Sequence, residues 1–149
     1  MTKGNIKIIA TNKKAHFNYF LSKFLEVGIE LKGTEIKSLR VNGASIGDSY
    51  VVFRNGEAEI INMYIKTYDH GNIFNHDPLR NRKLLLHKKE IRFFEMKMKA
   101  EGYTVVPTKI YFSHGKAKLE IALAKGKKLY DKRQSIKERD IQRDIDRGD

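Results

Sequence analysis

A β-hairpin predicted in residues 51–65, VVFRNGEAEIINMYI, limits the choice of fold more than any other segment. Two runs rich in β-branched and aromatic residues flank the pair Asn55-Gly56. Asn-Gly is the preferred pair for a two-residue type I′ turn, whose twist suits antiparallel strands. A second hairpin is predicted in residues 104–126, with its turn around residues 113–116. The fold should therefore be built on antiparallel strand pairs.

Two amphipathic helices are predicted between the strands. Apolar residues recur at i, i+3 and i+4 in residues 12–28, where Asn12 suits the N-cap and Gly28 the end of the helix. The second helix covers residues 87–102. We also predict a short strand in residues 5–10, a long strand in residues 29–41 that bends at Gly33, and a turn with a short helix in residues 42–50.

These elements predict one mainly β domain with five or six short, largely antiparallel strands. The leading fold is an OB-like antiparallel β-barrel flanked by two or three helices, and an open α+β sandwich is the alternative. Residues 1–125 would form the barrel domain, and residues 126–149 would form a charged C-terminal tail.

The net charge indicates a polyanionic partner. The 149 residues include 30 Lys and Arg against 18 Asp and Glu, which gives a net charge of +12. Nucleic acid or an acidic membrane face would suit this charge, and a solvated basic surface is the alternative. The absence of Cys excludes disulfides and cysteine-ligated metals. Without a long apolar run or signal-peptide pattern, we expect a soluble, cytoplasmic protein.

No motif in the sequence supports an enzyme. His70 and His76 share a loop with Asp69 and Asp77, but their spacing matches no zinc motif. The GKK at residues 126–128 lacks the Ser or Thr and the earlier Gly of a phosphate-binding loop. We therefore predict no catalytic residues, no metal and no cofactor.

Two segments carry the basic character. Residues 79–99 hold eight Lys and Arg against two Glu, and a basic loop from Arg80 to Lys83 precedes a basic helix start. Such a surface can follow a phosphate backbone, although a solvated helix face is the alternative. Residues 125–149 hold nine Lys and Arg, six Asp and Glu and few apolar residues. This tail should be disordered alone and helical on a partner, or simply solubilising.

Five blocks of sequence, taken together and in this order, resemble the SsrA-binding protein family. They are GIELKGTEIKSLR, DSYVVFRNGEAEI, NHDPLRNRKLLLHKKEI, EGYTVVPTKIYF and AKGKKLYDKR. The resemblance implies an OB-like barrel that binds the tRNA-like domain of transfer-messenger RNA (tmRNA). It also implies trans-translation, in which stalled bacterial ribosomes are rescued and their incomplete peptides are tagged, with no catalysis by this protein. A permanent ribosomal RNA-binding protein and an RNA-processing enzyme are the competing hypotheses.

The resemblance also implies which residues bind RNA, and the basic loop adds three more. The implied residues are Glu26, Lys37, Arg40, Leu85, His87 and Lys118, and the added ones are Arg80, Arg82 and Lys83. A carboxylate such as that of Glu26 cannot attract phosphate. It should instead orient a basic neighbour or accept a hydrogen bond from a base or a ribose hydroxyl.

The resemblance implies that the tail acts on the ribosome rather than on tmRNA. It would enter the vacant mRNA channel beside the ribosomal RNA of the decoding centre and fold there as a helix. The residues concerned are Gly126, Lys127, Lys128, Tyr130, Asp131, Lys132 and Arg133. Phe17 and Tyr130 stand where relatives often carry His, and Tyr keeps stacking but loses protonation near neutral pH. We expect a monomer that does not bind membranes.

Overall fold

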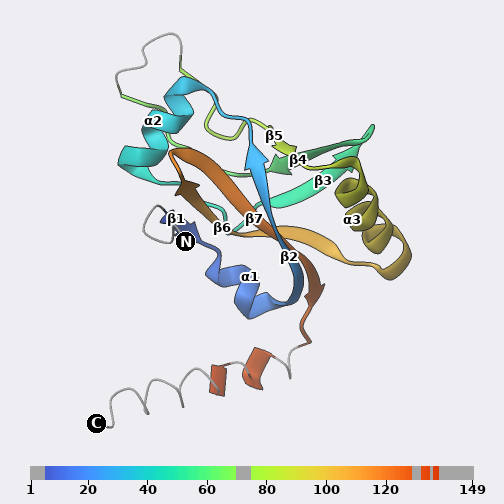
Figure 1. Ribbon diagram of the computed structural model, residues 1–149. Helices are drawn as coiled ribbons and strands as arrows, with labels where there is room; N and C mark the ends of the chain where they lie inside the picture. Colours follow the sequence, from blue (N-terminus) through green and yellow to red (C-terminus); the bar gives the residue numbers. More distant parts are fainter. Residues whose placement is uncertain (1–5, 70–74, 129–131, 135, 138–149) are drawn as a thin grey trace.

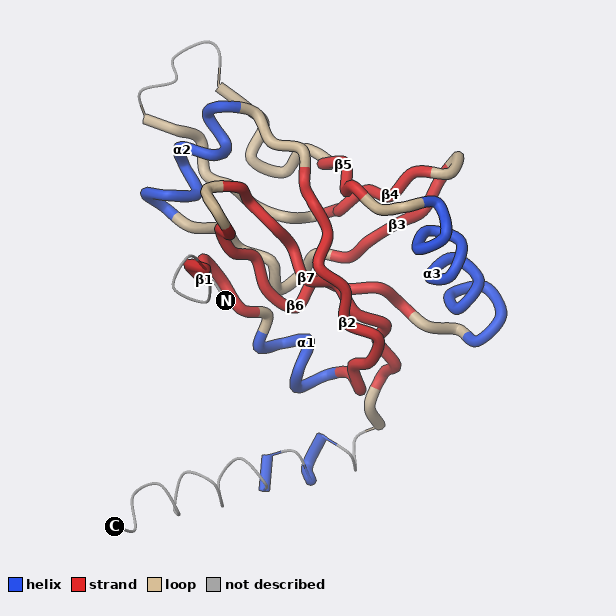
Figure 2. The backbone as a smooth tube through the Cα atoms, in the orientation of Figure 1, coloured by secondary structure: helices blue, strands red, loops and turns tan. Residues whose placement is uncertain are grey.

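Seven antiparallel strands form one sheet in the computed structural model, which describes residues 6–69, 75–128, 132–134 and 136–137 (Figure 1). The strands are β1 Ile6–Thr11, β2 Tyr19–Ile29, β3 Tyr50–Arg54, β4 Glu57–Ile61, β5 Arg82–Leu85, β6 Thr104–Ser113 and β7 Lys116–Gly126. Their order across the sheet is β1-β6-β7-β2-β5-β4-β3. The long strands β2 and β7 run beside each other through the middle of the molecule (Figure 2).

Three helices accompany the sheet: α1 Lys13–Asn18, α2 Gly33–Asn42 and α3 Lys88–Glu101. Helices α2 and α3 lie at opposite ends of the sheet (Figure 1). Phe94 of α3 stacks on Phe53 of β3, with ring centroids 6.3 Å apart. Buried aliphatic residues from β2 to β7 complete the core, including Ile60, Leu119 and Ile121. No helix in the described ranges is long and apolar enough to cross a membrane.

Both predicted hairpins are confirmed. Strands β3 and β4 pair through Arg54 and Glu57, and the turn residues Asn55 and Gly56 have φ angles of 53° and 73°. A type I′ turn requires positive φ at both central positions, which Asn and Gly tolerate best. Strands β6 and β7 form the second hairpin, with positive φ at His114 and Gly115.

The predicted antiparallel β fold with flanking helices is confirmed, but the barrel is not closed. Strands β1 and β3 stand at the two edges of the strand order. Strand β3 packs against β6 across the core, yet the described residues show no hydrogen-bonded ladder between them. The sheet therefore curves around the core without completing a ring.

Three predicted elements are wrong. The helix predicted through residue 28 ends at Asn18, and residues 19–29 form β2, which pairs with β7. The strand predicted in residues 29–41 ends at Ile29, and Gly33 begins α2 instead of bending a strand. The backbone N–H of Lys32 donates to Glu35 Oε1 at 2.7 Å, which caps this helix. The short helix predicted in residues 42–50 is absent, since residues 43–49 form a loop with a bridge from Ser45 to Tyr64.

Candidate nucleic-acid interface

A row of residues crosses three neighbouring strands on the outer face of the sheet. Lys118 of β7 pairs with Gly28 of β2, and Gly28 pairs with Leu85 of β5. Leu85 is 50% exposed, whereas its neighbour Leu84 is buried. Because side chains alternate between the two faces of a strand, this row points away from the core. The sheet thus joins residues that are far apart in sequence.

A groove of about 510 Å³ lies along this row, between the strands and the start of α3. We call it the central groove. It is lined by Glu26, Gly28, Gly56, Glu57, Lys83, Leu84, Leu85, Leu86, His87, Lys88, Glu90, Ile91 and Lys118. A neighbouring hollow of about 330 Å³ shares Gly28, Leu85 and Lys118 and adds Lys116. Five residues predicted to bind RNA therefore lie together: Glu26, Lys83, Leu85, His87 and Lys118.

Gly28 allows a close approach of Leu85 at the centre of the row. A Cβ atom added at this position would lie 3.2 Å from Leu85 Cδ1 and 3.3 Å from Leu85 Cβ. These distances are tighter than most Cβ contacts, so an added Cβ would require Leu85 to shift by a few tenths of an ångström. Glycine at this position thus fits the close packing of β2 against β5 beneath the groove.

The acidic side chains of the groove have specific partners. Glu26 is held by a hydrogen bond with the hydroxyl of Tyr111, and burial together with this carboxylate raises the pKa of Tyr111. Glu90 accepts a hydrogen bond from the backbone N–H of His87 at 2.9 Å. Glu57 forms an ion pair with Lys83 at 2.9 Å, and this hydrogen bond raises the pKa of Lys83. The carboxylates are thus oriented by neighbours, and each retains capacity to accept another hydrogen bond.

Three lysines supply the charge available to a partner. Lys88, Lys116 and Lys118 form no ion pair with any residue in the described part of the chain. They border the central groove and the neighbouring hollow. A surface with unpaired lysines around partly apolar residues can bind phosphates and still contact sugars or bases.

Arg82 does not fit the predicted role in RNA contact. Its side chain is fully buried and its Nε donates to Glu35 Oε2 at 2.5 Å. Its other nitrogens donate to the carbonyls of Met63 at 2.7 Å and Pro78 at 3.2 Å. Side chains alternate along β5, and Arg82 shares the inward face with Leu84. The guanidinium therefore holds the fold together beneath the surface.

Arg80 belongs to the same cluster but reaches the surface. Its guanidinium donates to both oxygens of Glu35, at 2.7 Å and 3.0 Å, and its side chain is 26% exposed. Burial raises the pKa of Glu35, but hydrogen bonds from Arg80, from the backbone of Lys32 and from Arg82 outweigh burial and lower it. Glu35 therefore stays ionised at neutral pH and ties α2 to the segment that enters β5.

Lys37 and Arg40 lie apart from the groove, on the exposed side of α2. The guanidinium of Arg40 stands 4.5 Å from the centre of the Phe112 ring. Lys37 Nζ stands 5.9 Å from the Tyr68 ring. Both residues are exposed, so they form a second basic area that the structure does not join to the groove lining.

The first two residues of the tail, Gly126 and Lys127, which we call the root of the tail, are bonded to the domain. Gly126 pairs with Tyr19 at the end of the β2–β7 ladder, and the backbone N–H of Lys127 donates to Asn18 O at 2.9 Å. Lys127 Nζ stands 5.2 Å from the centre of the Phe20 ring. Residues 132–134 and 136–137 are helical, which includes Lys132 and Arg133. Tyr130 and Asp131 lie outside the described residues.

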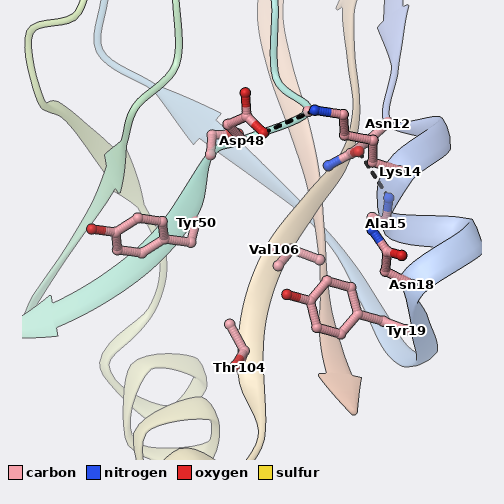
Figure 3. Close-up of a pocket in the computed structure, with 11 residues that line it drawn as sticks. Asn12, Lys14, Ala15, Asn18, Tyr19, Asp48, Tyr50, Thr104 and Val106 are labelled. Atoms are coloured by element: carbon pink, nitrogen blue, oxygen red, sulfur yellow. Dashed lines mark hydrogen bonds and ion pairs between the residues drawn. The ribbon is translucent and has the colours of Figure 1, made fainter. Parts of the chain in front are cut away.

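A pocket of about 480 Å³ beside this root was not anticipated from the sequence. Tyr19 and Tyr50 lie on opposite sides of Thr104 and Val106, and Lys14 Nζ bonds Asp48 Oδ1 at 3.1 Å across its rim (Figure 3). The only signal was Asn12, the predicted N-cap, which accepts from the Ala15 N–H at 3.0 Å. The pocket depends on how α1 meets the loop before β3, and no local pattern specifies that contact.

Comparisons with known proteins agree in their assignment. A family model described as SmpB protein matches residues 9–148. An SsrA-binding protein from Malacoplasma penetrans is 58% identical over 139 residues, which cover 93% of this chain and 95% of the relative. One from Fervidobacterium nodosum is 57% identical and covers 94% and 95%. A solved structure of tmRNA-SmpB in the bacterial ribosome contains a chain with a TM-score of 0.67 and 45% identity, covering 80% of this chain and 85% of that one.

Proposed function

The chain belongs to the SmpB protein family, and we propose that it binds the tRNA-like domain of tmRNA and delivers this RNA to stalled ribosomes for trans-translation. The sequence-based recognition is thereby confirmed. The protein acts as an RNA-binding adaptor and not as an enzyme. The observation that carries the proposal is the central groove, in which β2, β5, β7 and the start of α3 bring five predicted RNA-binding residues together.

The groove suits a folded RNA element. Lys88, Lys116 and Lys118 would neutralise backbone phosphates, which supplies affinity without reading sequence. Glu26, oriented by Tyr111, would accept a hydrogen bond from a ribose hydroxyl or a base edge. Leu85 offers an exposed apolar contact between these polar groups. Arg80 and Arg82 support this surface through Glu35, and only Arg80 is exposed enough to touch RNA.

The tail would carry the second activity. We assign residues 1–125 to RNA binding and residues 126–149 to the vacant mRNA channel of the ribosome, where Gly126 to Lys128 and Tyr130 to Arg133 would act. The fixed root at Asn18 and Tyr19 supports this division, because it anchors the start of the tail away from the central groove. Bacterial ribosomes work in the cytoplasm, so we place the protein there. We also expect it to act as a monomer.

A binding titration tests the proposal. The full chain and a version that ends at Gly126 should both prefer the tRNA-like domain of tmRNA over an RNA hairpin of the same length. The titration is run near 150 mM salt, because phosphate-driven affinity collapses as the salt concentration rises. Equal competition by the hairpin, or binding by the full chain alone, would mean that the tail is a nonspecific RNA clamp.

Lys118 provides a second test within the groove. Lys118→Ala should weaken binding of the tRNA-like domain and reduce the slope of log K against log salt concentration by about one. Lys99→Ala is the matched control, since Lys99 is exposed at the end of α3 and faces Glu95 at 3.6 Å, outside the groove. An unchanged slope for Lys118→Ala would remove this residue from the RNA contact.

A further inference from the structure

A second groove adjoins the central groove at Glu90. It has a volume of about 300 Å³, lies between β2 and α3, and we call it the aromatic groove. Its lining consists of Lys23, Phe24, Leu25, Lys89, Glu90, Phe93 and Phe94. Glu90 lines both grooves, and Leu25 precedes Glu26 in β2, so the two grooves form one continuous surface. The proposed function uses none of the three phenylalanines.

A β-bulge presents Phe24 to the solvent. Ser22 pairs with Leu123 and Leu25 pairs with Ile121, so β2 holds one residue more than β7 between these pairs. Lys23 has a φ of 56°, in the left-handed region that few residues other than glycine adopt. Bulges redirect side chains and are frequent beside functional sites. Phe24 is consequently 51% exposed although it stands in a long central strand.

The other walls of the groove are aromatic as well. Phe94 is buried and forms an edge-to-face contact with Phe93, with ring centroids 5.5 Å apart. Phe93 is only partly buried, so α3 contributes an aromatic wall opposite β2. A volume of about 300 Å³ is at the lower end of the range for pockets that hold small organic groups. One flat ring fits such a space better than a folded peptide element does.

The rim of the groove is cationic. Lys23 and Lys89 are exposed and form no ion pair with a described residue. The one carboxylate of the lining, that of Glu90, already accepts the N–H of His87. Aromatic rings with lysines beside them suit single-stranded RNA, because a base stacks on the ring while its phosphates meet the cations.

We propose that the aromatic groove binds one unstacked nucleobase of the RNA held in the central groove. The base would stack on Phe24, and the phosphates on either side of it would lie near Lys23 and Lys89. This inference rests on the proposed function and extends its contact surface by one nucleotide. A purely apolar protein segment would use the apolar walls but would leave the two lysines without a matching charge.

Substitutions at Phe24 test the stacking contact. Phe24→Ala should weaken binding of the tRNA-like domain by about 5-fold to 150-fold, the range found for loss of one stacked base. Phe24→Tyr should keep the affinity, and Phe24→Leu should lose most of it because an aliphatic side chain cannot stack. Phe20→Ala is the matched control, since Phe20 lies in the same strand and is 53% exposed but lines neither groove.

Salt dependence separates the two kinds of contact. Lys89→Ala should reduce the slope of log K against log salt concentration by about one, whereas Phe24→Ala should leave the slope unchanged. Thermal unfolding of each variant shows whether it is folded. Phe24→Leu keeps an apolar side chain and replaces Phe24→Ala in the comparison if the alanine variant does not fold.

The outcomes distinguish this inference from the proposed function. Wild-type affinity in Phe24→Ala, with weakened binding in Lys118→Ala, would overturn the stacking subsite and leave the proposed function standing. Failure of the wild-type protein to prefer the tRNA-like domain would overturn both. A photo-crosslinking residue, p-benzoylphenylalanine, placed at position 24 should attach to the RNA. Attachment only to a second copy of the protein would show that the groove is a protein interface.

Discussion

Replacing Arg82 with methionine should lower the free energy of unfolding by about 3–5 kcal/mol, the cost of leaving one member of a buried ion pair alone. Glu35 and Arg82 are both fully buried, with Arg82 Nε 2.5 Å from Glu35 Oε2. The same substitution leaves the carbonyls of Met63 and Pro78 without their donor. Chemical denaturation of the wild type and the variant measures the difference.

Two controls identify the cause of this loss. Arg80→Met should cost less, because Arg80 is partly exposed and water can replace it at Glu35. The double variant Glu35→Met with Arg82→Met should regain part of the stability, since no carboxylate then remains buried without its partner. If the stability losses of the single variants Glu35→Met and Arg82→Met simply add in the double variant, the ion pair is not the source of the destabilisation.

The same cluster sets a pH dependence with a defined sign. The pKa of Glu35 is lowered by folding, so its contribution to stability is fully present above the ordinary value of 4.5. That contribution is lost as the pH falls below 4.5 and through the pKa of the folded state. Burial lowers the pKa of Arg82, and Glu35 partly restores it, so both groups remain charged at neutral pH. The double variant should lack this part of the acid sensitivity.

The two hairpins were predictable because turn chemistry is local. Asn55-Gly56 and the turn at His114-Gly115 contain residues that accept positive φ, and the flanking runs suit strands. The error at residues 19–29 has an equally local cause. The bulge at Lys23 adds one residue to β2, which shifts the period-two alternation and leaves apolar residues at helix-like spacing.

Helix α2 was missed because its start carries no conventional signal. Lys32 occupies the N-cap position, where Ser, Thr, Asp or Asn is usual, and Gly33 opens the helix. The capping contact comes from Glu35, which also receives Arg80 and Arg82 from 45 and 47 positions later in the chain. These contacts between residues distant in sequence help to fix the helical conformation of α2, and a local sequence pattern cannot reveal them.

The members of the candidate interface could be named from sequence motifs, but their convergence could not. Gly28 and Leu85 meet because β2 pairs with β5, which follows from the order of the whole sheet. The prediction that Arg82 is a surface cation was based only on the number of lysines and arginines in the segment, and it is wrong because this side chain is buried. In β5, exposed Lys83 and Leu85 alternate with buried Arg82 and Leu84, so the Arg82 side chain points into the core. Its charge is tolerated there because it pairs with the buried carboxylate of Glu35, a contact that the sequence does not reveal.

Replacing Asp131, Lys132 and Arg133 together with alanine should abolish peptide tagging and leave binding of the tRNA-like domain nearly unchanged. These residues belong to the sequence block that resembles the tail signature of the SsrA-binding proteins. Tagging is measured in a translation reaction stalled on a message without a stop codon, and RNA affinity is measured by titration. Replacing Lys137, Glu138 and Arg139 is the matched control, because it removes the same number of positive and negative charges from the tail.

The geometry of the long strands β2 and β7 is the reason to expect that tagging can be lost while RNA affinity is kept. Gly28 pairs with Lys118 at the groove, and Tyr19 pairs with Gly126 at the root of the tail, nine residues earlier in β2. At about 3.3 Å per residue the path along β2 between these two points is at most about 30 Å, because the bulge at Lys23 shortens it, and an RNA element in the groove need not reach the tail. Equal loss of tagging in both triple variants would mean that the tail acts through charge alone. Loss of RNA affinity together with tagging would mean that one surface, and not two, performs both steps.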